Sequence, residues 1–150
     1  MNELIRIIMV FIGGIGFSIV FNVHGYRLFV NAAGAVAAWV LYLLAFAWTE
    51  DVFWSYFIAT MITAVACEAL ARVTHTPTTL MIVPMIVPPL VPGGDLYNAF
   101  YNLIKSNQEE AVFYGTRLVL EIAAINFGII LAATLVKLVY YGRQMRREAA

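Results

Sequence analysis

Residues 78–98 read TTLMIVPMIVPPLVPGGDLYN, and this segment sets the architecture expected for the rest of the chain. It is as apolar as a membrane-spanning helix, yet four prolines and two adjacent glycines interrupt it. A proline inside a helix removes one backbone hydrogen bond and crowds the preceding turn. In lipid, broken backbone persists only where protein or a water-filled cavity shelters it. The segment therefore predicts a discontinuous membrane helix, the kind that holds the solute in transporters.

The composition around this segment is that of an integral membrane protein. The chain of 150 residues is 63% hydrophobic and 12% charged, and its mean hydropathy is +0.85. Soluble domains have about 25% charged residues. A formal net charge of zero argues against a strongly basic nucleic-acid-binding protein. The first apolar run lacks a small-residue cleavage site, so we expect a retained helix and one membrane domain over residues 1–150.

Apolar runs of about 20 residues predict an all-α, polytopic helix bundle with about five spans. The fourth span is the broken one, and the polar residues 105–115 are expected to form a loop. An alternative with four crossings makes the broken segment re-entrant. The expected spans cover residues 4–23, 31–48, 52–73, 78–104 and 118–141.

Charge placement predicts the orientation of these spans. Five crossings put Arg27, the turn at 72–75 and the basic tail at 142–148 on one side, and the acidic pairs 50–51 and 109–110 on the other. Lys and Arg accumulate on the cytoplasmic side of membrane proteins. We therefore expect a cytoplasmic C-terminus and an outer N-terminus.

The break at Pro92-Gly93-Gly94-Asp95 is the first candidate binding site. A restarted helix would present free N–H groups and a positive dipole end to an anionic group such as a carboxylate. The alternative is a plain turn at the membrane edge. Asp95 would either cap the new helix and repel an anion, or meet the ammonium of a zwitterion. Tyr97 and Asn98 fall in its first turn and could face the solute.

Ionisable side chains inside spans are functional candidates by default. Glu121 follows Arg117 by four residues, and Glu68 precedes Arg72 by four, so each pair shares a helix face. Either glutamate could couple a proton, or each pair could be a structural ion pair. Asn126 lies in the middle of the last span and would either bond across helices or line the pathway.

Other chemistry has no support in the sequence. We find no metal-ligand cluster, phosphate-binding loop or nucleophile–base pair, so neither a cofactor nor an enzyme is expected. Small residues recur at four-residue spacing, for example Gly14 and Ser18, which lets membrane helices approach closely. Five spans are few to enclose a pathway for a solute. A partner subunit or a homo-oligomer is therefore expected.

Residues 84–99, with Pro84 and the run PPLVPGGDLYNA from position 88, resemble the threonine/serine exporter (ThrE) family, and in particular its short, membrane-only component. Pro88, Pro92, Gly93 and Tyr97 match the family motif; Asp95 has no place in it. The resemblance implies export of amino acids such as threonine and serine, or of a dicarboxylate in related two-component systems. It also implies a bacterial inner membrane, proton-gradient-driven antiport and a larger partner subunit. The alternative function is a non-transporting assembly subunit of a larger membrane complex.

Overall fold

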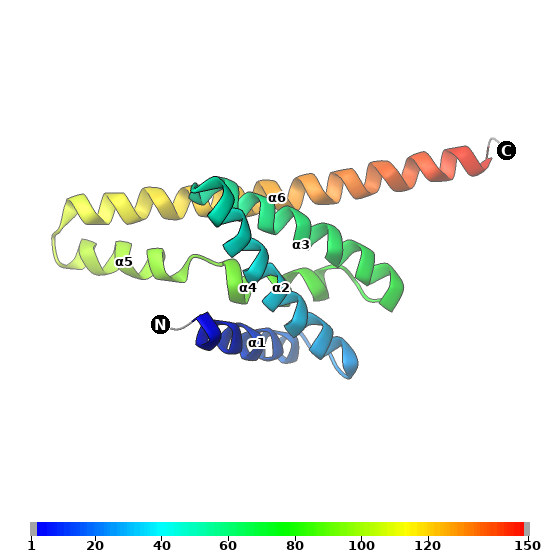
Figure 1. Ribbon diagram of the computed structural model, residues 1–150, viewed down its shortest axis with the longest axis horizontal. Coiled ribbons are helices and arrows are strands. Elements are labelled where there is room, and N and C mark those ends of the chain that lie inside the picture. Colours follow the sequence, from blue (N-terminus) through cyan, green and yellow to red (C-terminus); the bar gives the residue numbers. More distant parts are fainter. Residues whose placement is uncertain (1–2, 149–150) are drawn as a thin grey trace.

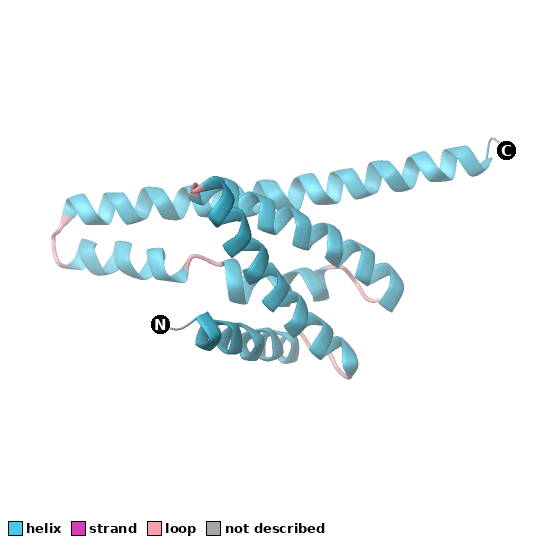
Figure 2. Cartoon of the chain, viewed as in Figure 1, coloured by secondary structure: helices cyan, strands magenta, loops and turns pink. Residues whose placement is uncertain are grey.

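A computed structural model describes residues 3–148, with side-chain surroundings for residues 3–140. Every regular element in this part of the chain is a helix (Figures 1 and 2). The six helices are α1 (Glu3–Val20), α2 (Tyr26–Thr49), α3 (Val52–Thr74), α4 (Thr79–Leu90), α5 (Gly93–Ile104) and α6 (Gln108–Glu148). The predicted all-α class is confirmed.

The helix boundaries follow the predicted spans with two differences. α2 begins at Tyr26, five residues before its predicted start, because the first turn closes between residues 21 and 25. Gly25 adopts a left-handed φ of 70° there, which glycine does without steric cost. The predicted loop at 105–115 is wrong, because α6 already begins at Gln108. Glu109 and Glu110 are good helix formers. In the first turn of α6 their negative charges interact favourably with the positive end of the helix dipole and stabilise the helix.

Small residues bring the first helices together, as their spacing predicted. Gly14 of α1 lies so close to α2 that a Cβ there would meet the Ala32 Cα at 2.9 Å. A Cβ added to Gly128 of α6 would likewise meet the Phe57 carbonyl oxygen of α3 at 3.0 Å. Van der Waals contact between closely spaced backbones is a main source of helix association in lipid.

The discontinuous helix is present. α4 and α5 are bent by 52° at the break between Leu90 and Gly93. α4 packs against α1, α2 and α3, and Leu90 and Pro92 are buried on either side of the interruption. α4 is therefore packed inside the bundle up to the break, whereas Val91, Gly93 and Gly94 at the break itself are exposed.

Asn31 replaces one of the backbone hydrogen bonds that the prolines remove from α4. Pro84 has no N–H to donate to the Leu80 carbonyl four residues earlier. The Asn31 Nδ2 of α2 donates to that carbonyl at 3.0 Å and to the Ser18 Oγ of α1 at 3.1 Å. One fully buried amide thus ties three helices together.

α5 lies apart from the packed bundle. It pairs mainly with α6 and has no buried residue, and Figure 1 shows α5 and the start of α6 extending side by side beyond the ends of α1, α2 and α3. The apolar part of α6, Gln108–Tyr140, has 33 residues, or about 50 Å at 1.5 Å per residue, against a bilayer core of about 30 Å. Part of α6 therefore extends beyond the hydrocarbon.

Within residues 3–148, four helices are long and apolar enough to cross a membrane, and the bent pair α4–α5 can form a fifth span. These are α1, α2, α3 and α6. The chain is therefore a multi-pass membrane helix bundle, and about five spans fit it.

Candidate functional site

An ion cluster joins the restarted helix to the last span. The Arg117 Nε lies 2.8 Å from the Asp95 Oδ2 and 3.3 Å from the Glu121 Oε1. The second contact confirms the pair expected from the four-residue spacing. The first links α5 to α6 and is an ion pair without hydrogen-bond geometry, since the Asp95 Oδ2 accepts no hydrogen bond despite the short distance.

Asp95 does not cap α5, and that part of the prediction is wrong. The helix begins at Gly93, and its N-cap is Pro92, with no side-chain cap hydrogen bond. The Leu96 N–H already donates to the Pro92 carbonyl at 3.1 Å, so Asp95 falls inside the first turn. There its carboxylate is attracted by the Arg117 guanidinium instead of the backbone amides.

The three side chains of the cluster differ in their exposure to solvent. The Glu121 side chain is 2% exposed, Asp95 16% and Arg117 40%. The Glu121 Oε2 is buried and has no hydrogen-bond partner. Tyr42 of α2 and Tyr56 of α3, whose rings are 4.7 Å apart, lie within electrostatic range of Glu121 and Asp95. The three charged side chains of the cluster therefore come from two helices, α5 and α6.

Charge counting defines what this cluster can do. With both carboxylates ionised, two negative charges face one guanidinium, which leaves one excess negative charge beside apolar walls. Such a charge is far less stable there than in water. A single proton on Glu121 or Asp95 makes the cluster neutral.

The open helix end predicted at the break is also present. The amides of Gly94 and Asp95 have no acceptor among the described residues, and both glycines, Gly93 and Gly94, are exposed. A cleft of about 220 Å³ lies beside this end. Val91, Pro92 and Leu96 line one wall, and the α6 residues Leu118, Ile122, Ile125 and Asn126 line the other.

Asn126 reaches this cleft and does not join two helices. Its Nδ2 donates at 2.8 Å to the Ile122 carbonyl of its own helix, and the residue is exposed. The structure thus gathers Pro92, Asn126, Asp95 and Glu121 around the junction of α5 and α6.

Three predicted residues lie away from this junction or face outward. Pro88 sits inside α4 against Gly13 of α1. Tyr97 is 66% exposed and stacks on Tyr101 of its own helix. Asn98 is half-buried, and its carbonyl accepts a hydrogen bond from the Asn102 Nδ2 at 3.0 Å.

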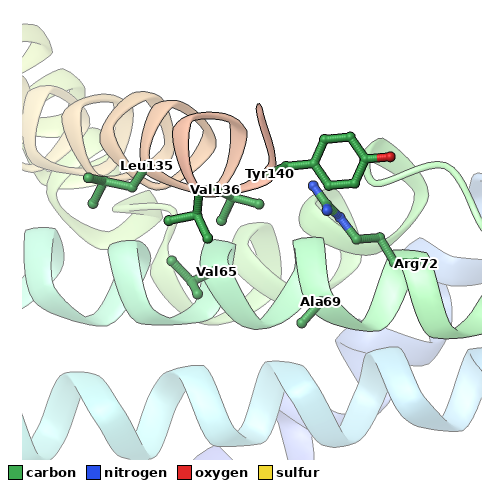
Figure 3. A pocket seen from close by; sticks show the side chains of 7 residues that line it. Val65, Ala69, Arg72, Leu135, Val136 and Tyr140 are labelled. Carbon is green, nitrogen blue, oxygen red and sulfur yellow. The ribbon is translucent and has the colours of Figure 1, made fainter. Parts of the chain in front are cut away.

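Glu68 belongs to a separate region at the other end of α3. It forms the expected pair with Arg72, at 3.9 Å. Arg72 extends from α3 over the Tyr140 ring of α6, 4.8 Å from its centre (Figure 3). Both line an apolar groove of about 460 Å³ between the two helices. The Glu68 carboxylate is therefore remote from the Arg117 cluster.

The sequence analysis did not predict the contacts of the site that join different helices. It did not connect Asp95 to Arg117, and it did not place Tyr42 and Tyr56 within electrostatic range of Asp95 and Glu121. No signal in the sequence indicated these contacts. Among the side chains described, no group of three or more His, Cys, Asp and Glu is arranged to hold a metal ion.

The membrane architecture and this polar junction can be compared with known proteins. Comparisons with curated proteins and with solved structures give no match. The family model described as "Threonine/Serine exporter, ThrE" matches residues 6–135. The match covers the helical bundle, the broken helix and the whole ion cluster, so the chain belongs to the threonine/serine exporter (ThrE) family, a family of membrane transporters.

Proposed function

We propose that this chain is the membrane subunit of a proton-coupled secondary exporter of threonine- and serine-type amino acids. The observation that carries the proposal is the Asp95–Arg117–Glu121 cluster at the restart of a broken membrane helix. Family membership supplies the class of transported solute. The ion cluster beside the interrupted backbone supports the proposal of a proton site.

Coupling follows from the competition for Arg117. When both carboxylates are ionised, each attracts the guanidinium, and α5 is held against α6 through Asp95. A proton on either carboxylate removes one of these attractions. The remaining charges are then balanced, and the link between α5 and α6 depends on which carboxylate carries the proton. Proton binding can therefore change how firmly the broken helix is attached to the last span.

We place the solute at the cleft beside Pro92. Among the residues that line the cleft, Asn126 offers a polar side chain and the others are apolar. The free amides of Gly94 and Asp95 follow the lining residue Pro92 in the chain. Exposed amides at a helix N-terminus favour a carboxylate. Pro88, Tyr97 and Asn98 remain predictions for solute contact in another conformation.

Among the two glutamates, we favour Glu121 over Glu68 as the proton carrier. Glu121 is almost fully buried and has an unpartnered oxygen, whereas Glu68 forms a partly exposed pair with Arg72. Both remain in the test below, because each was expected from the sequence to be a candidate.

A larger partner subunit, a second copy of the chain, or both would complete the pathway. The exposed apolar surface of α5 supports such a partner. The side chains that form it are each more than half exposed in the single chain: Tyr97, Phe100, Leu103 and Ile104. We expect the assembly to lie in a bacterial inner membrane with the C-terminus in the cytoplasm, as the placement of basic residues suggests.

The test is gradient-driven export of labelled threonine and serine from vesicles that contain the chain and its partner. Glu121→Gln removes the charge with little change of shape and should abolish gradient-driven export, whereas Glu68→Gln should retain it. Membrane levels of both variants serve as the control for folding. Unchanged export by both variants and by Asp95→Asn would favour the assembly-subunit alternative and remove the coupling proposal.

A further inference from the structure

Another groove opens where the turn between α2 and α3 faces α6. Its volume is about 510 Å³, and it is separate from the cleft beside Pro92. Glu50, Asp51 and Phe53 line it on the side of the turn, and Phe113, Thr116 and Arg117 line it on α6. The groove therefore combines one cation and two carboxylates with apolar walls.

Arg117 lines this groove and also belongs to the ion cluster. Its Nε contacts Asp95 and Glu121. Neither of its Nη amino groups donates a hydrogen bond to any residue that the structure describes. The side chain is 40% exposed. The paired Nη groups of an arginine match the two oxygens of a carboxylate, so the accessible part of Arg117 is suited to a carboxylate ligand.

The acidic residues across the groove also have unused capacity. The Glu50 carboxylate makes no hydrogen bond or ion pair within the described residues. Asp51 uses one oxygen, Oδ1, to accept the Trp54 N–H at 3.0 Å. No ion pair joins either residue to Arg117 in this part of the chain. Glu50 and Asp51 thus line the same groove as Arg117, whose own ion pairs are with Asp95 and Glu121.

We propose that this groove binds a zwitterionic α-amino acid, with its carboxylate on the Nη groups of Arg117 and its ammonium at Glu50 and Asp51. The inference rests on the proposed function and assigns its solute a second site, separate from the cleft beside Pro92. A dicarboxylate would bring its second negative charge to two carboxylates and be repelled, so the groove selects amino acids over dicarboxylates. Because the acidic turn is expected on the outer side of the membrane, the groove is a solute-binding site near the outer end of the transport pathway.

The two acidic residues permit variants that remove charge and keep the backbone in place. Glu50 ends α2 in a left-handed conformation with φ 52°, which asparagine adopts more readily than glutamate. Asp51 is the N-cap of α3, and asparagine caps helices about as well as aspartate. The double variant Glu50→Asn/Asp51→Asn should therefore fold normally. A matched control, Glu109→Gln/Glu110→Gln, removes the same charge from the exposed first turn of α6.

The experiment measures saturable binding of tritiated L-threonine to the full chain in lipid nanodiscs, with competition by L-threoninamide and succinate. We expect threoninamide and succinate to compete at least about tenfold more weakly than unlabelled threonine, since each loses or opposes a charge-assisted contact. The Glu50→Asn/Asp51→Asn variant should lose at least about tenfold in threonine affinity at an unchanged melting temperature. The control variant should bind like the unmodified chain.

Three results would overturn the inference: no saturable threonine binding, succinate competing as well as threonine, or full affinity in the Glu50→Asn/Asp51→Asn variant. Its failure is distinguishable from that of the proposed function. Normal binding by that variant, with export abolished by Glu121→Gln, refutes the groove and leaves the exporter intact. Lost binding, with export unaffected by Glu121→Gln, supports the groove and refutes the coupling.

Discussion

Replacing Asn31 by leucine tests how the bundle tolerates a helix broken by proline. The substitution keeps the side-chain volume similar, but it removes the donor to the Leu80 carbonyl and to the Ser18 hydroxyl. Pro84 cannot supply the missing donor to Leu80. A buried acceptor left without a partner costs about 1–3 kcal/mol, and interhelical hydrogen bonds in membranes contribute about 0.6 kcal/mol on average, with a maximum of about 1.7 kcal/mol. Two lost bonds therefore predict destabilisation by about 2 kcal/mol.

A double-mutant cycle isolates the part that belongs to the broken helix. Pro84→Ala restores an N–H that can bond the Leu80 carbonyl within α4. In that background Asn31→Leu should cost about 1 kcal/mol less, because only the bond to Ser18 is lost. Reversible unfolding in mixed micelles, followed by tryptophan fluorescence, supplies the four free energies. Additive effects of the two substitutions would refute the idea that Asn31 replaces the hydrogen bond that Pro84 removes.

Further predictions concern packing, orientation and the ion cluster. Gly14→Ala should destabilise the chain by about 1–3 kcal/mol through overpacking against the α2 backbone, whereas Gly16→Ala, with no atom within 4 Å of its added Cβ, should be neutral or stabilising in the same unfolding assay. A reporter enzyme fused to the C-terminus should be active in the cytoplasm, and activity on the outer side would contradict the orientation assigned from the basic residues. Asp95→Asn should weaken the attachment of α5 to α6 and raise hydrogen exchange in α5 before any other helix; protection equal to that of the unmodified chain would show that the ion pair does not hold α5.

The sequence predicted those features that local chemistry controls. Proline and glycine at 84–94 marked the broken helix, and the four-residue spacing of Arg117 and Glu121 gave their ion pair. The start of α6 was missed because Glu109 and Glu110 were interpreted as loop residues, although charged residues extend a helix well where it leaves the hydrocarbon.

The remainder depends on tertiary contacts that one sequence does not encode locally. Asp95 meets Arg117 only because α5 folds back along α6, and Asn31 meets the Leu80 carbonyl across 49 residues of chain. The local sequence pattern made Asp95 a candidate site residue, but it did not indicate which side chain Asp95 contacts. The same holds for Glu50 and Asp51, which read as a turn until the structure placed them across a groove from Arg117.

The most direct test of the Asp95–Arg117–Glu121 cluster is the proton flux that accompanies threonine movement. The chain and its partner are reconstituted in liposomes that contain a pH-sensitive dye, and a threonine gradient is imposed. We predict that the unmodified protein moves protons opposite to threonine, and that Glu121→Gln exchanges threonine across the membrane without any proton movement. Proton flux in the Glu121→Gln variant equal to that of the unmodified protein would contradict the account.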